Sequence, residues 1–143
     1  MTLPSAVSLV TLGVRDVQAS AAFYERLGFE RSPNAEPAIA FFRTAGTVLA
    51  LFGEDALADD AGVPSDRAGS FRGVTLAINL PSREAVDDAY AHALGAGAAP
   101  LVAPEEVFWG GYRGYVADPD GHAWELCHNP FFPVDERGVV TLP

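Results

Sequence analysis

Hydrophobic and polar residues follow two different periods along the chain, and these periods predict helices and strands. Two segments carry apolar residues at i, i+3, i+4 and i+7, which is typical of amphipathic helices, and the shorter apolar runs predict strands. Two helices and eight strands are therefore predicted, in the order β-α-β-β-β followed by β-α-β-β-β. The predicted strands are 7–14, 29–32, 38–43, 47–52, 73–80, 99–108, 112–117 and 122–128, and the helices are 17–27 and 83–94.

Capping residues mark both ends of the two helices. Asp16 and Ser82 stand where an N-cap accepts a hydrogen bond from the first helical turn. Gly28 follows the first helix, and Gly95 and Gly97 end the second, because glycine accepts the left-handed conformation of a C-cap.

The two halves also resemble each other at the level of residues. The segment Thr11–Val14 is similar to Thr75–Ile78, and Leu27-Gly28 is similar to Leu94-Gly95. We therefore expect one domain, 1–143, with an α+β fold of two tandem modules. Module 1 covers about 7–53, an acidic linker or mobile loop covers 54–72, module 2 covers about 73–128, and an irregular tail covers 129–143.

The Asp118–Gly121 turn predicts which side chains of the last two strands share a face. Proline and glycine favour a tight turn that pairs Asp118 with His122. Because side chains alternate across a strand, two groups follow. Val116, Trp124 and Leu126 lie on one face, and Arg113, Tyr115, Glu125 and Cys127 lie on the other.

A second hairpin is predicted at Thr44–Gly46, as a three-residue loop with Gly46 in the left-handed conformation. This loop would place Ile39, Phe41, Leu49 and Leu51 on one face and Ala40, Phe42, Val48, Ala50 and Phe52 on the other. In strands 7–14 and 73–80 the same alternation leaves Thr11, Thr75 and Asn79 on the face with fewer large aliphatic residues. Small, polar and aromatic side chains together are typical of a ligand cleft.

Composition narrows the kinds of molecule that the protein could bind. The formal net charge is −10 with nine scattered Lys and Arg, which argues against nucleic acid and against an anionic membrane surface. Acidity would suit a cationic ligand, although solubility explains it as well. No apolar run is long enough to span a membrane, no secretory signal is present, and Cys127 cannot form an internal disulfide, so we expect a cytoplasmic protein.

These features together resemble the vicinal oxygen chelate superfamily, the glyoxalase, bleomycin-resistance and extradiol dioxygenase group. The resemblance rests on the repeated modules, on Phe23-Tyr24 and Leu27-Gly28-Phe29 after Asp16, and on Asp118–Gly121 followed by Trp124-Glu125-Leu126. It covers roughly residues 7–128. It implies a curved mixed sheet with helices on the convex face, a concave ligand cleft and a homodimer.

The resemblance also implies metal ligands at four positions, which here are Leu9, Ala50, Gly73 and Glu125. Only Glu125 can ligate, and one carboxylate does not hold a divalent metal tightly. His92, His122 and His128 are predicted on the second helix, at a turn and on the helix-facing side. We therefore predict no tightly bound metal and no other cofactor.

Several residues have both a functional and a structural interpretation. Glu125 is a candidate catalytic base or cation ligand, or it forms an ion pair with Arg113. Tyr115, Phe42 and Phe52 either stack on a planar ligand or form a dimer core. Trp109, beside Gly110-Gly111, either forms a ligand wall or covers the sheet edge. Cys127 is expected to be a small buried apolar residue.

Three functions remain open on the sequence. The first is binding or sequestration of a small, partly aromatic organic molecule without a tightly bound metal. Its candidate ligand-binding residues are Thr11, Phe42, Phe52, Thr75, Asn79, Trp109, Arg113 and Tyr115. The second is a lyase, isomerase or dioxygenase that uses Glu125, with or without a metal. The third is a structural dimer module with a vestigial cleft.

Overall fold

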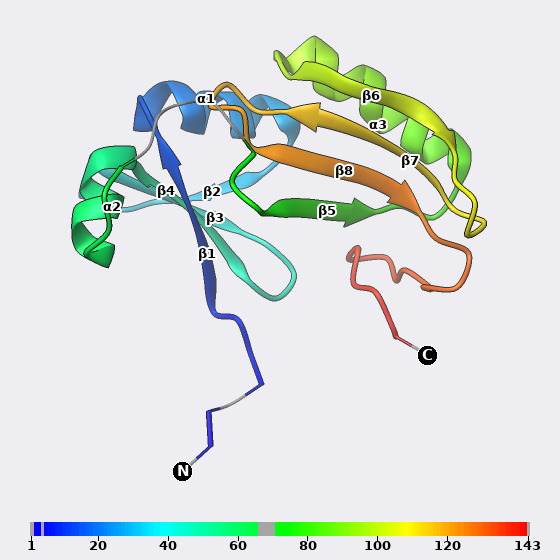
Figure 1. Ribbon diagram of the computed structural model, residues 1–143, viewed down its shortest axis with the longest axis horizontal. Helices are drawn as coiled ribbons and strands as arrows, with labels where there is room; N and C mark the ends of the chain where they lie inside the picture. The colour runs from blue at the N-terminus through cyan, green and yellow to red at the C-terminus, as the bar shows by residue number, and fades with distance from the viewer. Residues whose placement is uncertain (1, 4, 66–70, 143) are drawn as a thin grey trace. The chain divides into compact units, whose positions relative to one another are not determined.

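The repeated modules appear as two compact units. The computed structural model describes residues 2–3, 5–65 and 71–142, and the chain divides into units 1–65 and 66–143. Each unit has one four-stranded mixed sheet with its own helices (Figure 1). The predicted α+β fold of two β-α-β-β-β modules is confirmed.

In the first unit, the first and last strands pair in parallel and the others pair antiparallel, in the order β1-β4-β3-β2. The elements are β1 (Leu9–Val14), α1 (Val17–Leu27), β2 (Glu30–Ser32), β3 (Ile39–Arg43), β4 (Val48–Gly53) and α2 (Glu54–Ala61).

Both ends of α1 are where the capping residues predict. The Asp16 carboxylate accepts a hydrogen bond from the backbone N–H of Ala19 at 2.9 Å. Gly28 has φ 115°, and its N–H donates to the carbonyls of Tyr24 and Glu25. A residue with a Cβ would be strained there, so glycine ends the helix at this point.

The core of the first unit is an aromatic cluster between α1 and its sheet. Tyr24 contacts Phe23, Phe29 and Phe42 at ring-centroid distances of 5.0, 5.6 and 5.9 Å, two of them edge-on. Phe42 also contacts Phe29 edge-on, at 6.4 Å. Such aromatic pairs add to the free energy gained by burial of the rings, so this cluster holds α1 on the sheet.

The structure overturns the predicted faces of β3. Phe42 lies opposite Leu49, and Ala40 lies opposite Leu51, so the loop has four residues, 44–47, instead of three. Gly46 is not among the glycines with positive φ in the described chain. One extra loop residue moves every side chain of β3 to the other face. The ligand-facing placement of Phe42 is therefore wrong: its side chain is fully buried under α1, and Phe41 takes its place.

The predicted linker also contains a helix. α2 occupies residues 54–61 and packs against β1 and β4, and a Cβ at Gly13 would lie 3.3 Å from the Cα of Glu54. Alanines favour a helix, and Glu54 and Asp55 in its first turn interact well with the helix dipole. The expectation of a loop is wrong for 54–61, and residues 66–70 of the expected linker lie outside the described chain.

The second unit repeats the arrangement in the order β5-β8-β7-β6, with β5 parallel to β8. Its elements are β5 (Thr75–Asn79), α3 (Arg83–Ala96), β6 (Ala99–Glu106), β7 (Tyr112–Ala117) and β8 (Ala123–His128). Figure 1 shows α3 running along one side of the sheet, where it packs against β6, β7 and β8. Val86 and Ala93 of α3 are buried in this contact.

The hairpin between β7 and β8 forms as predicted. The N–H of Asp118 donates to the carbonyl of His122, and the Asp118 carboxylate accepts from the N–H groups of Asp120 and His122 at 2.9 and 2.8 Å. Val116 lies opposite Trp124, and Tyr115 lies opposite Glu125. The predicted faces of both strands are therefore confirmed.

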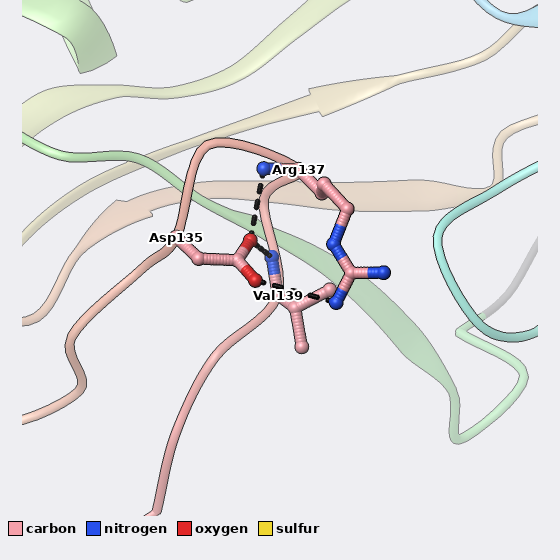
Figure 2. A network of polar contacts seen from close by, with 3 residues as sticks. All are labelled: Asp135, Arg137 and Val139. Atoms are coloured by element: carbon pink, nitrogen blue, oxygen red, sulfur yellow. Dashed lines mark hydrogen bonds and ion pairs between the residues drawn. The ribbon is translucent and has the colours of Figure 1, made fainter.

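Residues 129–142 form turns and one isolated bridge between Val134 and Val140. Figure 2 shows how Asp135 closes this loop: its carboxylate accepts from the N–H groups of Arg137 and Val139, both at 2.9 Å. These hydrogen bonds lower the pKa of Asp135, the one from Val139 most. The described helices include none that could cross a membrane.

Candidate functional site

The candidate site lies on the side of the second sheet that faces away from α3, which we call the polar face. Trp124, Leu126 and Val116 are buried on the α3 side, and the register of the four strands assigns the remaining residues to the other side. The polar face consists of Thr75, Ala77, Asn79, Ala99, Val102, Glu105, Arg113, Tyr115, Ala117, Ala123, Glu125 and Cys127.

Glu125 is at the centre of this face. It lies opposite Tyr115 on β7 and opposite Ala77 on β5. The Tyr115 hydroxyl lies near the side chains of Glu125 and Thr75, and both affect its pKa. Burial raises the pKa of Tyr115, and the charge and hydrogen bond of Glu125 raise it further against the opposing effects of Thr75 and Arg113. Tyr115 is therefore a neutral donor at neutral pH.

Cys127 is the second side chain beside Glu125. Burial raises the pKa of its thiol to about 11, and the neighbouring Glu125 carboxylate contributes to the same shift. The buried position predicted for Cys127 is confirmed, and a thiol that stays protonated is a poor nucleophile. The interaction of Cys127 with Glu125 was not predicted, although the strand alternation already placed both residues on one face.

Arg113 pairs with Glu105 of β6, at 3.0 Å between Nη1 and Oε1. The sequence suggested Glu125 as the ion-pair partner of Arg113, and the structure shows Glu105 instead. The guanidinium also lies 5.8 Å from the centre of the Tyr115 ring, within the range of a cation–π contact. Glu105 was missed because β6 shifts its register twice, between Pro100 and Val102 and between Val102 and Glu105, and periodicity alone does not reveal such bulges.

Trp109 lies at the end of the polar face because Gly111 has no side chain. The N–H of Gly110 donates to the carbonyl of Val107, and the N–H of Val107 donates to that of Gly111, so 108–110 is a three-residue loop with Gly110 at φ 96°. A Cβ at Gly111 would lie 2.0 Å from the indole of Trp109. Gly111 continues the alternation of Arg113 and Tyr115, so the indole lies over the polar-face side of the strand.

The remaining predicted site residues divide between the units. Thr75 and Asn79 lie on the polar face, where Asn79 is opposite Cys127. Thr11 and Phe52 belong to the first unit, on the side of its sheet that faces away from α1. Within the second unit the structure thus brings together Thr75, Asn79, Arg113, Tyr115 and Glu125, and adds Glu105, Cys127 and Gly111.

The donor set does not fit a tightly held divalent metal. Of the four positions that the family resemblance implies, only Glu125 carries a ligating side chain, and Leu9, Ala50 and Gly73 offer no side-chain donor. The described residues include no group of three or more His, Cys, Asp or Glu arranged to hold a metal. His128 lies on the α3 side, with Nδ1 3.0 Å from the carbonyl of Leu80.

Comparison with known proteins agrees with this fold. Residues 6–126 match the model of the Glyoxalase/Bleomycin resistance protein/Dioxygenase superfamily. The crystal structure of a glyoxalase-related enzyme from Fulvimarina pelagi has a TM-score of 0.86 and 36% sequence identity, over 97% of this chain and 99% of that one.

Two further relatives are more distant. An uncharacterised protein of Mycobacterium bovis is 32% identical over 121 residues, which covers 80% of this chain and 78% of the relative. A lactoylglutathione lyase from Agrobacterium tumefaciens has a TM-score of 0.67 and 24% identity, over 90% of this chain and 96% of that one, and so shares the fold. With its repeated modules and the family match over most of its length, the chain belongs to the glyoxalase/bleomycin resistance protein/dioxygenase superfamily.

Proposed function

We propose that the protein binds a small, partly aromatic organic molecule on the polar face, without a tightly bound metal. The observation that carries this proposal is the row of polar side chains Thr75, Tyr115, Glu125 and Cys127 on one face, beside the Arg113–Glu105 ion pair. Polar groups of this kind fix the orientation of a guest, and neighbours on the same face hold them in place before it arrives.

The side chains around this row support binding of an organic body. Ala77 and Ala123 are short and place little bulk next to Glu125. Tyr115 and Trp109 supply aromatic surface, and the Trp109 side chain keeps enough exposure, at 38% for the residue, to contact a guest. A mixture of small, aromatic and few polar residues is the usual lining of a small-molecule site.

We further propose a cytoplasmic homodimer. The single cysteine suits a reducing compartment. β1 and β5 are edge strands of their own sheets and carry no proline, and the edge of a sheet is a place where a partner strand can pair. Sedimentation of the purified protein tests this: a monomer at micromolar concentration would contradict it.

Ligand-induced stabilisation tests the binding proposal. A library of small aromatic compounds is screened by thermal denaturation against the wild type, Glu125→Gln, and the control Glu30→Gln on β2, whose carboxylate pairs with Arg43 in the other unit. A ligand that prefers the native state raises the Tm by mass action. We expect at least one compound to stabilise the wild type and Glu30→Gln but not Glu125→Gln.

Two results would contradict the proposal. The first is a library in which no compound stabilises the wild type, or in which every stabilising compound acts equally on Glu125→Gln. The second concerns the metal: a stoichiometric divalent ion in the purified protein, removed by a chelator and restored on addition, would overturn the metal-free assignment and favour an enzyme that uses Glu125.

A further inference from the structure

The charges of the polar face do not cancel. It carries three formally charged side chains, Glu105, Glu125 and Arg113. Arg113 forms an ion pair with Glu105 at 3.0 Å, and the Arg113 side chain is only 22% exposed. Glu105 therefore compensates the positive charge of Arg113. One negative charge therefore remains on the described part of this face, and it is on Glu125.

The groups beside Glu125 do not neutralise it. Tyr115 lies opposite Glu125 and Cys127 lies on the same face of β8, and neither a phenol nor a thiol carries a positive charge in any protonation state. A neutral donor orients a carboxylate but leaves its charge for a further partner. Arg113 lies on the same face as both groups, but its short contact is with Glu105.

Glu125 can be approached from the β5 side of the sheet. Its direct neighbour there is Ala77, which is exposed and ends at a methyl group, and Thr75 beside it is exposed as well. Glu125 is partly buried, and this partial removal from water strengthens its interaction with a charged guest. A compact charged group reaches Glu125 on this side without displacing Tyr115 or Cys127.

We propose that the ligand is an organic cation, a primary ammonium or amidinium group on an aromatic or apolar body, and that its charged group binds Glu125. This inference rests on the proposed function, since it names the ligand class of the same site. The body of the ligand packs over Ala77 and Ala123, next to Tyr115. Anions are disfavoured because the only cation of the described polar face is already paired and the chain carries a net charge of −10.

Three probes of nearly equal shape test the charge: phenethylamine, phenethyl alcohol and 3-phenylpropionate. Their dissociation constants for the full-length protein are measured by isothermal titration at pH 7, at low and high salt. We expect the amine to bind about tenfold or more tightly than the alcohol, the carboxylate to bind most weakly, and salt to weaken only the binding of the amine.

Two substitutions localise the effect. Glu125→Gln is expected to weaken binding of the amine about tenfold while changing that of the alcohol less than about threefold. Glu105→Gln leaves Glu125 in place but releases the charge of Arg113, so it weakens amine binding and strengthens 3-phenylpropionate binding. Because Glu105 is 60% exposed, this variant tests the charge balance even if Glu125→Gln fails to fold. Glu30→Gln is the matched control and leaves all three constants unchanged.

The outcomes separate the two proposals. If the alcohol or the carboxylate binds the wild type as tightly as the amine, or if Glu125→Gln binds the amine unchanged, the cation inference is overturned while small-molecule binding stands. The same holds if the amine fails but other aromatic compounds of the library stabilise the wild type through Glu125. If no compound of either set binds, both proposals fail.

Discussion

The two sheets share one topology but differ in the face that their principal helix leaves uncovered. Each sheet pairs its first strand with its last in parallel and buries one face under α1 or α3. On the other face, the first sheet carries the largely apolar Ile39, Phe41 and Phe52, whereas the second carries Tyr115 and Glu125. The backbone pattern is therefore common to both units, and the chemistry that suggests a ligand site belongs to the second.

The comparison also shows where each sheet is tightly constrained. Phe42 and Leu51 are fully buried under α1, and Trp124 and Leu126 are almost fully buried on the α3 side. Changes on these covered faces should cost stability, whereas changes on the uncovered faces should alter interactions more than folding.

The largest expected loss of stability comes from substitution of a phenylalanine in β3, and it differs between the two neighbours Phe41 and Phe42. Phe42→Ala removes a fully buried ring that contacts Tyr24 and Phe29, and should lower the free energy of unfolding by about 3–5 kcal/mol. Phe41→Ala, on the partly exposed face, should cost on the order of 1 kcal/mol. Denaturant unfolding measures both, and equal losses would mean that the face assignment of β3 is mistaken.

The second-largest expected loss of stability is in the second sheet, and it depends on pH. The thiol of Cys127 has its pKa raised from 9.0 to about 11 in the folded protein. Its stabilising contribution is full below about pH 9, and it is lost as the pH rises towards 11, because the unfolded chain releases the proton first. The loss amounts to about 2–3 kcal/mol.

Unfolding of wild type and Cys127→Ala at pH 8 and pH 10.5 measures this contribution. The wild type should lose more stability over this interval than the variant, in which no thiol titrates. A variant that loses as much as the wild type would show that Cys127 is not desolvated beside Glu125.

Substitution of Gly111 should cost less stability, and removal of the Trp109 side chain should relieve that cost. Gly111→Ala forces the indole away from the strand and should destabilise the second unit by on the order of 1 kcal/mol, with a shift in tryptophan emission. In a Trp109→Ala background the same alanine should be nearly neutral, since the atoms that it meets are gone. A double-mutant cycle measures the coupling, and additive effects would contradict the packing of Trp109 over Gly111.

The smallest expected effect is the coupling free energy of an exposed ion pair. One such pair from each sheet is compared. Arg113 and Glu105 in the second sheet are 3.0 Å apart, whereas Arg43 and Glu30 in the first are 3.4 Å apart and more exposed. Double-mutant cycles should give a coupling of about 0.5 kcal/mol for the former and close to zero for the latter, since water screens exposed pairs. A stronger coupling for Arg43–Glu30 would reverse the contrast between the two sheets.

The two hairpins show how far sequence reasoning could reach. At Asp118–Gly121, proline and glycine specify one tight turn, so the faces of β7 and β8, and with them Tyr115 and Glu125, follow correctly. At Thr44–Thr47, a single glycine is compatible with loops of three or four residues, and the shorter choice inverted β3 and misplaced Phe42. The faces of the outer strands β1 and β5 were predicted because their alternation is regular.

Two other features were not predicted. α2 has no side-chain N-cap and buries none of its residues fully, so only its alanines, its acidic first turn and the C-cap Gly62 indicate a helix in the sequence. Glu105 reaches Arg113 only through the register shifts of β6, which depend on contacts between distant segments. In both cases tertiary packing decides the outcome.

The parallel pairing of the first and last strand in each unit has a consequence for the order of folding. β5 can join its sheet only beside β8, so it must wait until the whole module has left the ribosome, whereas the β7–β8 hairpin closes locally and early. The contact between β5 and β8 that sets Ala77 beside Glu125 is thus among the last to form, and the binding face is completed only when its module is finished.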